Sequence, residues 1–469
     1  MIDKAVVEAV LGRSLAQGGE FAEVFVEDKR SSAVSMDDAR IEELSSGRDR
    51  GAGIRVVVGE TTGFAHTTDL SEVGLMAAAE AAGSVAKAGG GGTRTVSLSV
   101  PGSRDGADRA VGGDGLIRPD QVSKSAKVAL LERANAQARS SDGAVTQVMA
   151  GYGDSLRRIL VANSDGLWAT DEQVRTRLSV TCVAEGDTGM QTGYESAAFT
   201  RGFEMFEDTD PEQVASEAAR RAVAKLRARP APSGVVPIVI KSGTGGILFH
   251  EACGHGLEAD HIVKDSSVYT GRVGELVASP LVTLVDDGTV SRQWGTAGID
   301  DEGRPSQRNV LIQDGILTDY MWDFLRARKE KKVSSANGRR QSYEHLPMVR
   351  MTNTYLMAGQ EDPDEILAQT PNGVYVAQLG GGQVNTATGD FVFGMTEAYL
   401  IENGRITEPL RNANLIGNGP DVLSRIDVVG NDFGMCPGTC GKDGQSVPVG
   451  CGQPTLRITG VTIGGTADG

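Results

Sequence analysis

The chain has 469 residues, of which 39% are hydrophobic and only 5% aromatic, and its formal net charge is −16 at pH 7. This length predicts two or three domains, and the few aromatic residues predict mainly aliphatic cores. The acidic balance argues against nucleic acids and anionic membranes as partners, because both select basic surfaces. No run of about 18 apolar residues is present to cross a membrane.

The first residues and the cysteines bear on the cellular compartment. The N-terminal segment lacks the pattern of a signal peptide and instead leads directly into an amphipathic helix. Five cysteines occur at positions 182, 253, 436, 440 and 451, and this scatter is not typical of a disulfide framework. We therefore expect a cytoplasmic protein with reduced thiols.

The first half of the chain combines helix and strand patterns. Helices are expected over residues 2–15, 71–87, 120–140 and 210–228. Strands are expected over 21–26, within 31–45, over 53–58 and 63–66 as a hairpin, and repeatedly between 145 and 194. The glycine-rich stretch 89–92 and the polar stretch 101–119 are predicted to be linking segments. Pro230 and Pro232 stop the last helix, which predicts a domain boundary there.

The second half is richer in strand and turn signals, with a short helix expected after Asp362. The predicted fold class is α+β. Residues 1–230 are expected to form a mixed α/β domain with an antiparallel sheet. Residues 231–469 are expected to form a mainly antiparallel β domain that carries the chemically active helix.

That helix contains the sequence His250-Glu251-Ala252-Cys253-Gly254-His255. It follows an apolar strand pattern over 235–240 and a turn over 242–246, which also offers an N-cap. Two imidazoles and a carboxylate in this spacing are typical of a zinc site that activates water. Residues i and i+5 diverge on an α-helix, so both imidazoles reach one metal only if the helix widens or ends between them. Gly254 and Gly256 provide freedom for this distortion.

The histidine motif and the glycine-rich segments also have structural interpretations. A His–Glu pair in an apolar helix can be a hydrogen-bonded core pair without a metal. The turn over 242–246 precedes a helix as phosphate loops do, but no Gly-Lys-Ser/Thr follows, so nucleotide binding is weakly indicated. The Gly380–Gly382 run favours a bend or a close backbone approach.

A glycine-rich tail carries three of the cysteines, within residues 434–455. With this tail, the chain resembles the TldD/PmbA family of metallopeptidases, on the TldD side. The resemblance covers nearly the whole length and depends on several motifs in the same order. Besides the histidine motif and the tail, these are Asp300-Asp301-Glu302-Gly303, Gly338-Arg339-Arg340, Ser342-Tyr343-Glu344-His345-Leu346-Pro347 and Arg350-Met351-Thr352-Asn353-Thr354.

The resemblance implies a Zn²⁺ ion held by His250, His255 and Cys440, the cysteine before Gly-Lys-Asp-Gly-Gln. Two imidazoles and one thiolate leave a fourth position for water, and Glu251 is expected to act as general base. Cys436 and Cys451 are extra to the family pattern, and Cys436 is the alternative third ligand. Cys253 is expected to be a small buried hydrophobe.

Several other residues are candidates for supporting roles. Tyr343 and His345 are predicted to stabilise the oxyanion or orient a ligand, with a structural histidine as the equal alternative. Glu258 is a conceivable fourth ligand, and neighbouring polar residues are candidates to support the ligands. Arginines are expected either to grip a peptide carboxylate or to form internal salt bridges. The polar residues that could support the ligands are Asp260 and His261. The arginines are Arg339, Arg340 and Arg350. His66 is expected to be structural.

The predicted function is a zinc-dependent peptidase that hydrolyses small or unfolded peptides. The resemblance also implies an assembly with a PmbA/TldE-type subunit, an enclosed site near the subunit interface, and a substrate bound in extended form. Two alternatives use the same residues: a scaffold whose zinc is purely structural, and a deformylase-like amide hydrolase.

Overall fold

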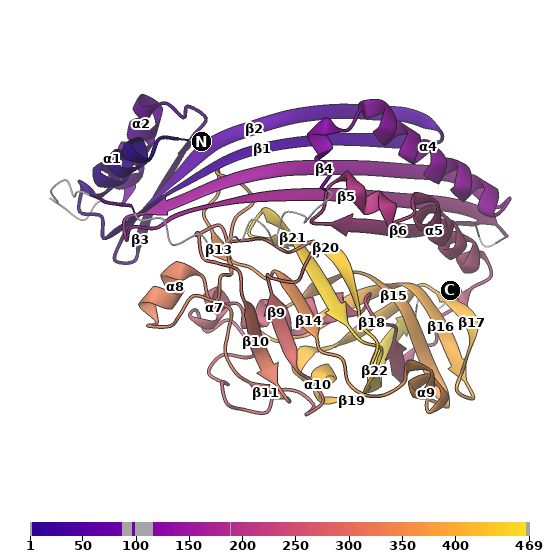
Figure 1. Cartoon of the computed structure of the whole chain (residues 1–469). Helices are drawn as coiled ribbons and strands as arrows, with labels where there is room; N and C mark the ends of the chain where they lie inside the picture. The colour runs from indigo at the N-terminus through magenta and orange to yellow at the C-terminus, as the bar shows by residue number, and fades with distance from the viewer. Residues whose placement is uncertain (1, 87–95, 99–115, 188, 466–469) are drawn as a thin grey trace.

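The computed structural model describes residues 2–86, 96–98, 116–187 and 189–465. Its N-terminal half is built on a long curved antiparallel sheet with the strand order β3-β2-β1-β4-β5-β6 (Figure 1). The strands are β1 (Phe21–Asp37), β2 (Arg40–Val58), β3 (Thr61–Thr67), β4 (Val145–Asn163), β5 (Trp168–Gly186) and β6 (Gly189–Phe199). The predicted hairpin turn at Gly59-Glu60 is confirmed between β2 and β3.

The strands in this half are longer than the sequence predicted. Residues 21–37 form one continuous strand, whereas separate strands were expected over 21–26 and within 31–45. The polar residues in the middle of β1 hide this continuity in the sequence, because they lack the apolar alternation by which a strand is recognised. They nevertheless pair with β2 and β4 in the structure. The linking segments predicted over 89–92 and most of 101–119 lie outside the described residues.

Helices cover the outer face of this sheet near both of its ends (Figure 1). They are α1 (Lys4–Leu15), α2 (Glu72–Val85), α4 (Lys124–Ser141) and α5 (Pro211–Leu226), with short 3-10 turns η1 (Pro119–Gln121) and η2 (Phe203–Glu207). Alternate β1 residues explain the arrangement: Val24 packs in the core beneath α1 and α2, and Val34 packs in the core beneath α4 and α5. The helix predicted from residue 120 begins later, because Pro119–Gln121 forms a separate turn and Ser123 caps α4.

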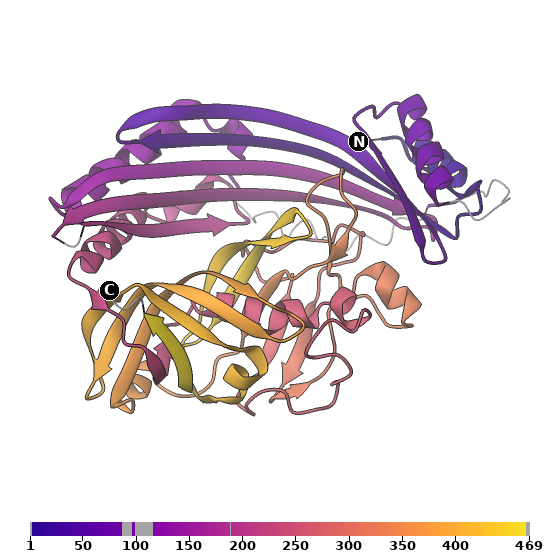
Figure 2. The ribbon, with the colours of Figure 1, turned by 180° about the vertical axis from the view of Figure 1, so that it is seen from behind.

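The C-terminal half lies under the concave face of the long sheet (Figures 1 and 2). One of its sheets has the order β15-β8-β22-β18-β16-β17-β7, with β19 paired to β22. These strands are β7 (Arg229–Pro230), β8 (Gly234–Ile240), β15 (Asn372–Val384), β16 (Asp390–Glu402), β17 (Arg405–Arg411), β18 (Ala413–Asn418), β19 (Ile426–Val429) and β22 (Leu456–Gly465). The Gly380–Gly382 run lies inside β15, where the register with β16 is irregular.

A second sheet in this half has the order β11-β10-β9-β14-β21-β20, and β12 pairs separately with β13. The strands are β9 (Leu284–Asp287), β10 (Arg308–Gln313), β11 (Ile316–Leu317), β12 (Gly338–Arg339), β13 (Met348–Val349), β14 (Asn353–Leu356), β20 (Gly434–Lys442) and β21 (Gln445–Gln453). Short helices fill the space around them: α6 (Gly246–Phe249), α7 (Ala259–Ile262), α8 (Phe324–Lys329), α9 (Pro363–Ala368) and α10 (Gly419–Ser424). The α+β class is confirmed, and the C-terminal half is mainly antiparallel β.

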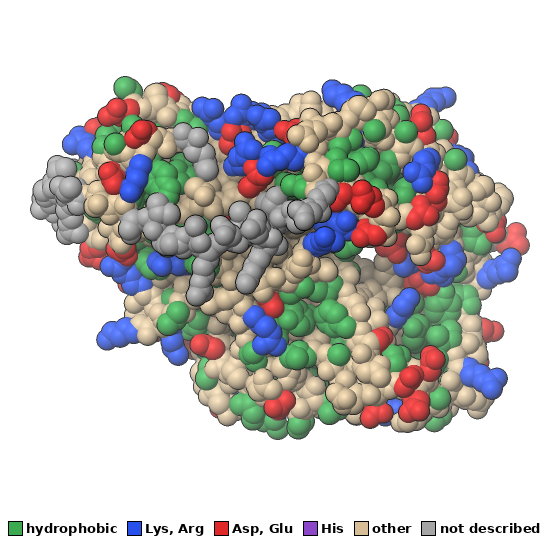
Figure 3. Space-filling model, in the orientation of Figure 1, with side chains coloured by type: hydrophobic (Ala, Val, Ile, Leu, Met, Phe, Trp, Pro, Cys, Tyr) green, Lys and Arg blue, Asp and Glu red, His purple; other side chains and the backbone are tan. Residues whose placement is uncertain are grey.

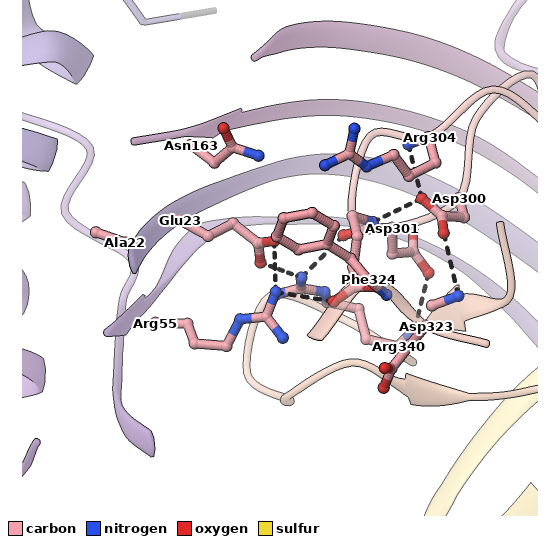
Figure 4. A network of polar contacts seen from close by, with 12 residues as sticks. Ala22, Glu23, Arg55, Asn163, Asp300, Asp301, Arg304, Asp323, Phe324 and Arg340 are labelled. Carbon is pink, nitrogen blue, oxygen red and sulfur yellow. Dashed lines mark hydrogen bonds and ion pairs between the residues drawn. The ribbon is translucent and has the colours of Figure 1, made fainter. Parts of the chain in front are cut away.

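A buried network of charged side chains joins the two halves (Figure 4). Arg55 of β2 lies 2.7 Å from Glu23 of β1 and 2.8 Å from Glu302 of the C-terminal half. Arg340, also from that half, lies 2.5 Å from Glu23. Removing one partner of such a pair leaves an uncompensated buried charge, so the network fixes how the halves meet.

The outer surface has no single charge character on the face that Figure 3 shows, where acidic and basic side chains are interspersed over the described part of both halves. Among the described residues, no helix combines the length and apolar character needed to cross a membrane.

Candidate metal centre

The histidine motif lies on a helix that changes its winding. Strand β8 leads through a turn into α6, and residues His250–Gly254 then continue as a π-helix, η3. The backbone N–H of His255 donates to the carbonyl of His250, five residues back. This is the local widening that the spacing predicted. A 3-10 turn, η4 (His255–Leu257), follows at once.

The N-cap of this helix differs from the prediction. Its N-cap is Gly245, which has no side chain to accept a hydrogen bond. The hydroxyl of Thr244 accepts instead from the backbone N–H of Leu379 in β15, at 2.9 Å. The turn therefore ties the helix to the neighbouring sheet rather than capping it through a side chain.

The structure brings together His250, His255 and Cys440, whose ligand atoms all lie within 4.8 Å of one another. The histidines come from η3 and η4, and the cysteine comes from β20 near the C-terminus. All three are buried. The Nε2 atom of His255 is 3.5 Å from the Cys440 Sγ, and the two imidazole rings lie nearly perpendicular at a centroid distance of 4.9 Å.

The chemistry of these donors fits a metal ion. The Nδ1 atom of His250 is buried and has no hydrogen-bond partner among the described residues. Burial alone would raise the pKa of the Cys440 thiol, but the charges and hydrogen bonds of His250 and His255 lower it to about 4. A thiolate and two imidazoles are a donor set that zinc accepts, and together they supply three ligands.

Polar contacts at the Nδ1 side of the ring orient His255. Its Nδ1 atom is 2.9 Å from Oε2 of Glu258, so its Nε2 atom is the one that faces Cys440. Burial alone would raise the pKa of the Glu258 carboxyl, but Lys442 and His255 hold it well below its usual range. Glu258 is thus engaged behind the imidazole, as carboxylates that support metal-bound histidines are.

Lys442 is the residue of this site that the sequence analysis missed. Its Nζ atom lies 2.8 Å from Glu258 and 2.8 Å from Asp260, and it donates to the carbonyl of Val349. It follows Cys440 by two residues on β20, inside the Gly-Lys-Asp-Gly-Gln segment. The side-chain alternation of a strand places residues i and i+2 on one face, which is the signal that could have found it.

Glu251 follows His250 directly in the chain, is partly buried, and interacts electrostatically with all three candidate ligands. Burial raises the pKa of its carboxyl, while the positive charges of His250 and His255 oppose that rise. A carboxyl group with a raised pKa is better suited to accept and release a proton near neutral pH.

Comparison with known proteins identifies the family. Models of the PmbA/TldA metallopeptidase domain 1, central domain and C-terminal domain match residues 22–86, 117–226 and 233–465. The chain belongs to the PmbA/TldD family of metallopeptidases. It is 41% identical to the metalloprotease TldD homolog of Haemophilus influenzae, over 95% of this chain and 93% of that protein. It is 36% identical to a metalloprotease of Methanothermobacter thermautotrophicus, over 95% of this chain and 96% of that protein.

Solved structures share the fold of this PmbA/TldD family member. TldE from Thermococcus kodakarensis matches with a TM-score of 0.79 at 21% identity, covering 98% of this chain and 100% of that chain. A Thermotoga maritima protein described as a candidate modulator of a DNA gyrase matches with a TM-score of 0.80 at 20% identity, with the same coverage. At these identities the likeness concerns the fold alone.

The structure does not bring Tyr343 and His345 into contact with the candidate ligands of this family member. The Tyr343 hydroxyl donates to Asp49 at 3.1 Å, and the ring packs against β2 so closely that a Cβ at Gly51 would meet it at 2.2 Å. The Nδ1 atom of His345 is 2.9 Å from the hydroxyl oxygen of Ser342. The contacts of Tyr343 dock the loop onto the N-terminal sheet, and the contact of His345 lies within the loop, so neither residue has a role in the proposed mechanism.

The other cysteines have different surroundings. Cys436 and Cys451 are directly opposite each other in the antiparallel pairing of β20 and β21. Burial raises the pKa of the Cys436 thiol to about 12 and that of Cys451 well above its usual value. Cys253 is fully buried and contacts the carbonyl of Phe249 at 3.0 Å, as expected of a small core residue. Among the three tail cysteines, Cys440 alone has a lowered thiol pKa.

The arginines of the Gly338–Arg340 and Arg350–Thr354 motifs have different roles. Arg340 forms the internal salt bridge to Glu23 already described. Arg350 donates to the carbonyls of Cys440 and Gln445, so it supports the hairpin that carries the candidate thiolate. Arg339 donates to the carbonyls of Met351 and Pro448. Neither Arg339 nor Arg350 forms a salt bridge within the described residues, so the predicted salt bridging holds for Arg340 alone.

Proposed function

We propose that this chain is a zinc-dependent peptidase that hydrolyses small or unfolded peptides, with His250, His255 and Cys440 as the zinc ligands. The observation that carries the proposal is the meeting of these three buried donors from distant parts of the chain. Family membership supports a metal-dependent peptidase, and a related protein of Saccharolobus solfataricus bears the name zinc metalloprotease TldD homolog.

The proposed mechanism assigns separate tasks to the residues of the site. When bound, zinc would supply a Lewis acid that activates water and polarises the scissile carbonyl. Glu251 would take a proton from the attacking water and deliver it to the leaving amine, a role for which its raised pKa suits it. Glu258 and Lys442 would keep the His255 ring in the orientation that presents Nε2.

Glu251→Gln tests the mechanism. The variant should fold and keep its zinc, because Glu251 is not assigned as a ligand, while cleavage of an unstructured peptide should fall at least about 100-fold. Zinc content is measured by atomic spectrometry and cleavage by mass spectrometry, with and without chelator. Undiminished cleavage by this variant would contradict the assignment of the general base.

The same experiment separates the alternatives. A purely structural zinc would give no chelator-sensitive cleavage in the parent chain, since such sites are usually closed by a fourth protein ligand. A deformylase-like enzyme would release formate from formylated peptides and leave internal peptide bonds intact.

We further propose that the chain works in the cytoplasm with a PmbA/TldE-type subunit. The fold match to a TldE structure supports a common architecture for such a pair, and the free state of all five cysteines agrees with a reducing compartment. Co-purification of the two chains, followed by cleavage with each chain alone and with both, would test the partnership.

A further inference from the structure

A polar cavity lies between the two halves of the molecule. Its volume is about 220 Å³, and its walls come from the concave face of β1, β4 and β5 on one side and from C-terminal loops and the β20–β21 hairpin on the other. Figure 2 shows this hairpin reaching up beneath the long sheet. Thr439 lines the cavity, and the next residue, Cys440, belongs to the candidate metal centre. The cavity therefore neighbours that centre without containing its ligands.

The lining of this cavity is cationic although the whole chain carries a charge of −16. Two of its residues are aspartates, Asp300 and Asp301, and five are lysine or arginine. The five are Lys29, Arg157, Arg175, Arg339 and Arg340. The positive charge is concentrated by the strand register, because Lys29 of β1 lies directly opposite Arg157 of β4.

Three of these cations have no carboxylate partner. Within the described residues, no salt bridge involves Lys29, Arg175 or Arg339. Arg175 donates to the carbonyls of Trp294 and Thr296 and to the side chain of Gln173, all neutral acceptors. Desolvation and the nearby positive charges of Arg339 and Arg157 together lower the pKa of Arg175 to about 9, although Asp171 and Asp301 oppose this change. These three cations on the cavity wall thus lack a direct salt bridge to any described residue, although Asp171 and Asp301 interact with Arg175 over a longer distance.

Some N–H groups of the arginines that line the cavity have no hydrogen-bond acceptor. Arg157 and Arg340 are buried, yet Nη2 of Arg157 and both Nε and Nη1 of Arg340 have no acceptor in the described part of the chain. A buried donor without an acceptor costs free energy, so native structures usually satisfy it. The two aspartates cannot supply the missing acceptors, since Asp301 already pairs with Arg157 and Asp300 accepts three backbone N–H groups.

We propose that this cavity binds a carboxylate group, held by the charges of Lys29, Arg175 and Arg339 and by the free N–H groups of Arg157 and Arg340. A guanidinium matches a carboxylate through paired hydrogen bonds, and one carboxylate would offset part of the positive charge of the lining. The two aspartates disfavour a dianion. The carboxylate belongs either to the C-terminus of a peptide or to a free small acid. The inference concerns a binding site and holds whether or not the chain cleaves peptides.

A pair of peptides that differ only at the C-terminus tests the first source. The peptides carry the same N-terminal fluorophore and end in a free carboxylate or an amide, and binding is measured by anisotropy in the Glu251→Gln background to prevent cleavage. We expect the free acid to bind roughly tenfold more tightly than the amide. Lys29→Gln and Arg175→Gln should abolish that preference.

Arg30→Gln is the matched control. Arg30 is the next residue of β1, faces the opposite side of the sheet and forms an exposed salt bridge with Asp120, so the variant removes the same charge from the same strand. It should keep the preference for the free acid. Lys29 is only partly buried, so Lys29→Gln remains informative if Arg175→Gln does not fold, as thermal unfolding will show.

Acetate tests the second source. Acetate should raise the thermal unfolding midpoint of the parent chain relative to chloride at equal ionic strength, and Lys29→Gln should remove that rise. The proposal is supported if Lys29→Gln, but not Arg30→Gln, loses the preference for the free-acid peptide or the rise of the unfolding midpoint with acetate. Loss of the peptide preference identifies a peptide C-terminus as the source of the carboxylate, and loss of the acetate effect identifies a free small acid. If the acid and amide peptides bind equally and the acetate response is the same in all variants, the proposal is wrong.

Discussion

At the scale of single residues, the choice among the tail cysteines depends on their neighbours rather than on their spacing. Cys436 and Cys440 lie four residues apart on β20, but only Cys440 has imidazoles beside its sulfur. Those imidazoles lower the thiol pKa to about 4 against the opposing effect of burial, whereas burial raises the pKa of Cys436 to about 12. A metal ligand must be a thiolate, so the environment already distinguishes the two.

We therefore predict that Cys440→Ser loses most of the bound zinc at neutral pH, while Cys436→Ser retains it. The physical reason is that a serine hydroxyl does not ionise under these conditions and is a poor ligand for zinc. The measurement is the zinc content of each purified variant after dialysis against a weak chelator. Cys451→Ser is a second control, because Cys451 faces Cys436 across the hairpin. Equal zinc content in all three variants would remove Cys440 from the site.

At the scale of elements, the helix that carries the histidines could be predicted in some detail. For both imidazoles to reach one metal, the five-residue spacing between His250 and His255 predicted a helix that widens or ends between them, and the π-helix is such a widening. The tail could be connected to this helix only through the family resemblance, because nothing local in a sequence relates residue 250 to residue 440. The i, i+2 alternation of a strand could have placed Lys442 on the same face as Cys440, but its carboxylate partners Glu258 and Asp260 lie on another element and could not be inferred locally.

The position of this helix depends on a close backbone approach at Gly246. A Cβ at this residue would lie 2.3 Å from the backbone nitrogen of Gly452 and 2.4 Å from the carbonyl carbon of Cys451, both in β21. Backbone atoms cannot move aside as a flexible side chain can. The first turn of α6 is therefore fixed against the strand that pairs with the one bearing Cys440.

Gly246→Ala should consequently destabilise the chain by about 2 kcal/mol and lower its zinc content, because the helix must shift away from β21. Thermal unfolding and metal analysis would measure the two effects. Gly441→Ala is the control, since a Cβ there meets no atom within 4 Å although the residue adjoins Cys440. A Gly246→Ala chain as stable and as rich in zinc as the control would show that the close approach is not required.

At the scale of the whole molecule, the relation between the two halves escaped sequence analysis. The motifs around Asp301 and Arg340 were recognised as family features, but their partners Glu23 and Arg157 lie far away in the first half and have no distinctive local pattern. Long strands with polar residues were equally hidden, since these residues are exposed or face the other half rather than an apolar core. Interdomain salt bridges and the cationic cavity depend on such pairings and become visible only in three dimensions.

A second ionic contact between the halves involves Glu397 of β16 and helix α5. Its carboxylate accepts from Arg220 at 2.9 Å, from Arg221 at 2.8 Å and from Tyr399 at 2.7 Å. Burial alone would raise the pKa of the Glu397 carboxyl, but these hydrogen bonds lower it to about 2. Because the folded-state pKa is lower than the unfolded value, the contact stabilises the folded state above the unfolded pKa, and the stabilisation is lost as the pH falls.

Glu397→Gln should therefore reduce the free energy of unfolding at pH 7 by about 2 kcal/mol, allowing for the partial exposure of Arg220. The difference from the parent chain should shrink as the pH falls from roughly 4.5 to about 2, that is, from the pKa of Glu397 in the unfolded chain to its pKa in the folded chain. Denaturant unfolding at a series of pH values measures it. Glu408→Gln, which breaks the exposed salt bridge with Arg229, should change stability little at any pH. A deficit in Glu397→Gln that stays constant with pH would mean that its cause is altered packing rather than the charge of Glu397.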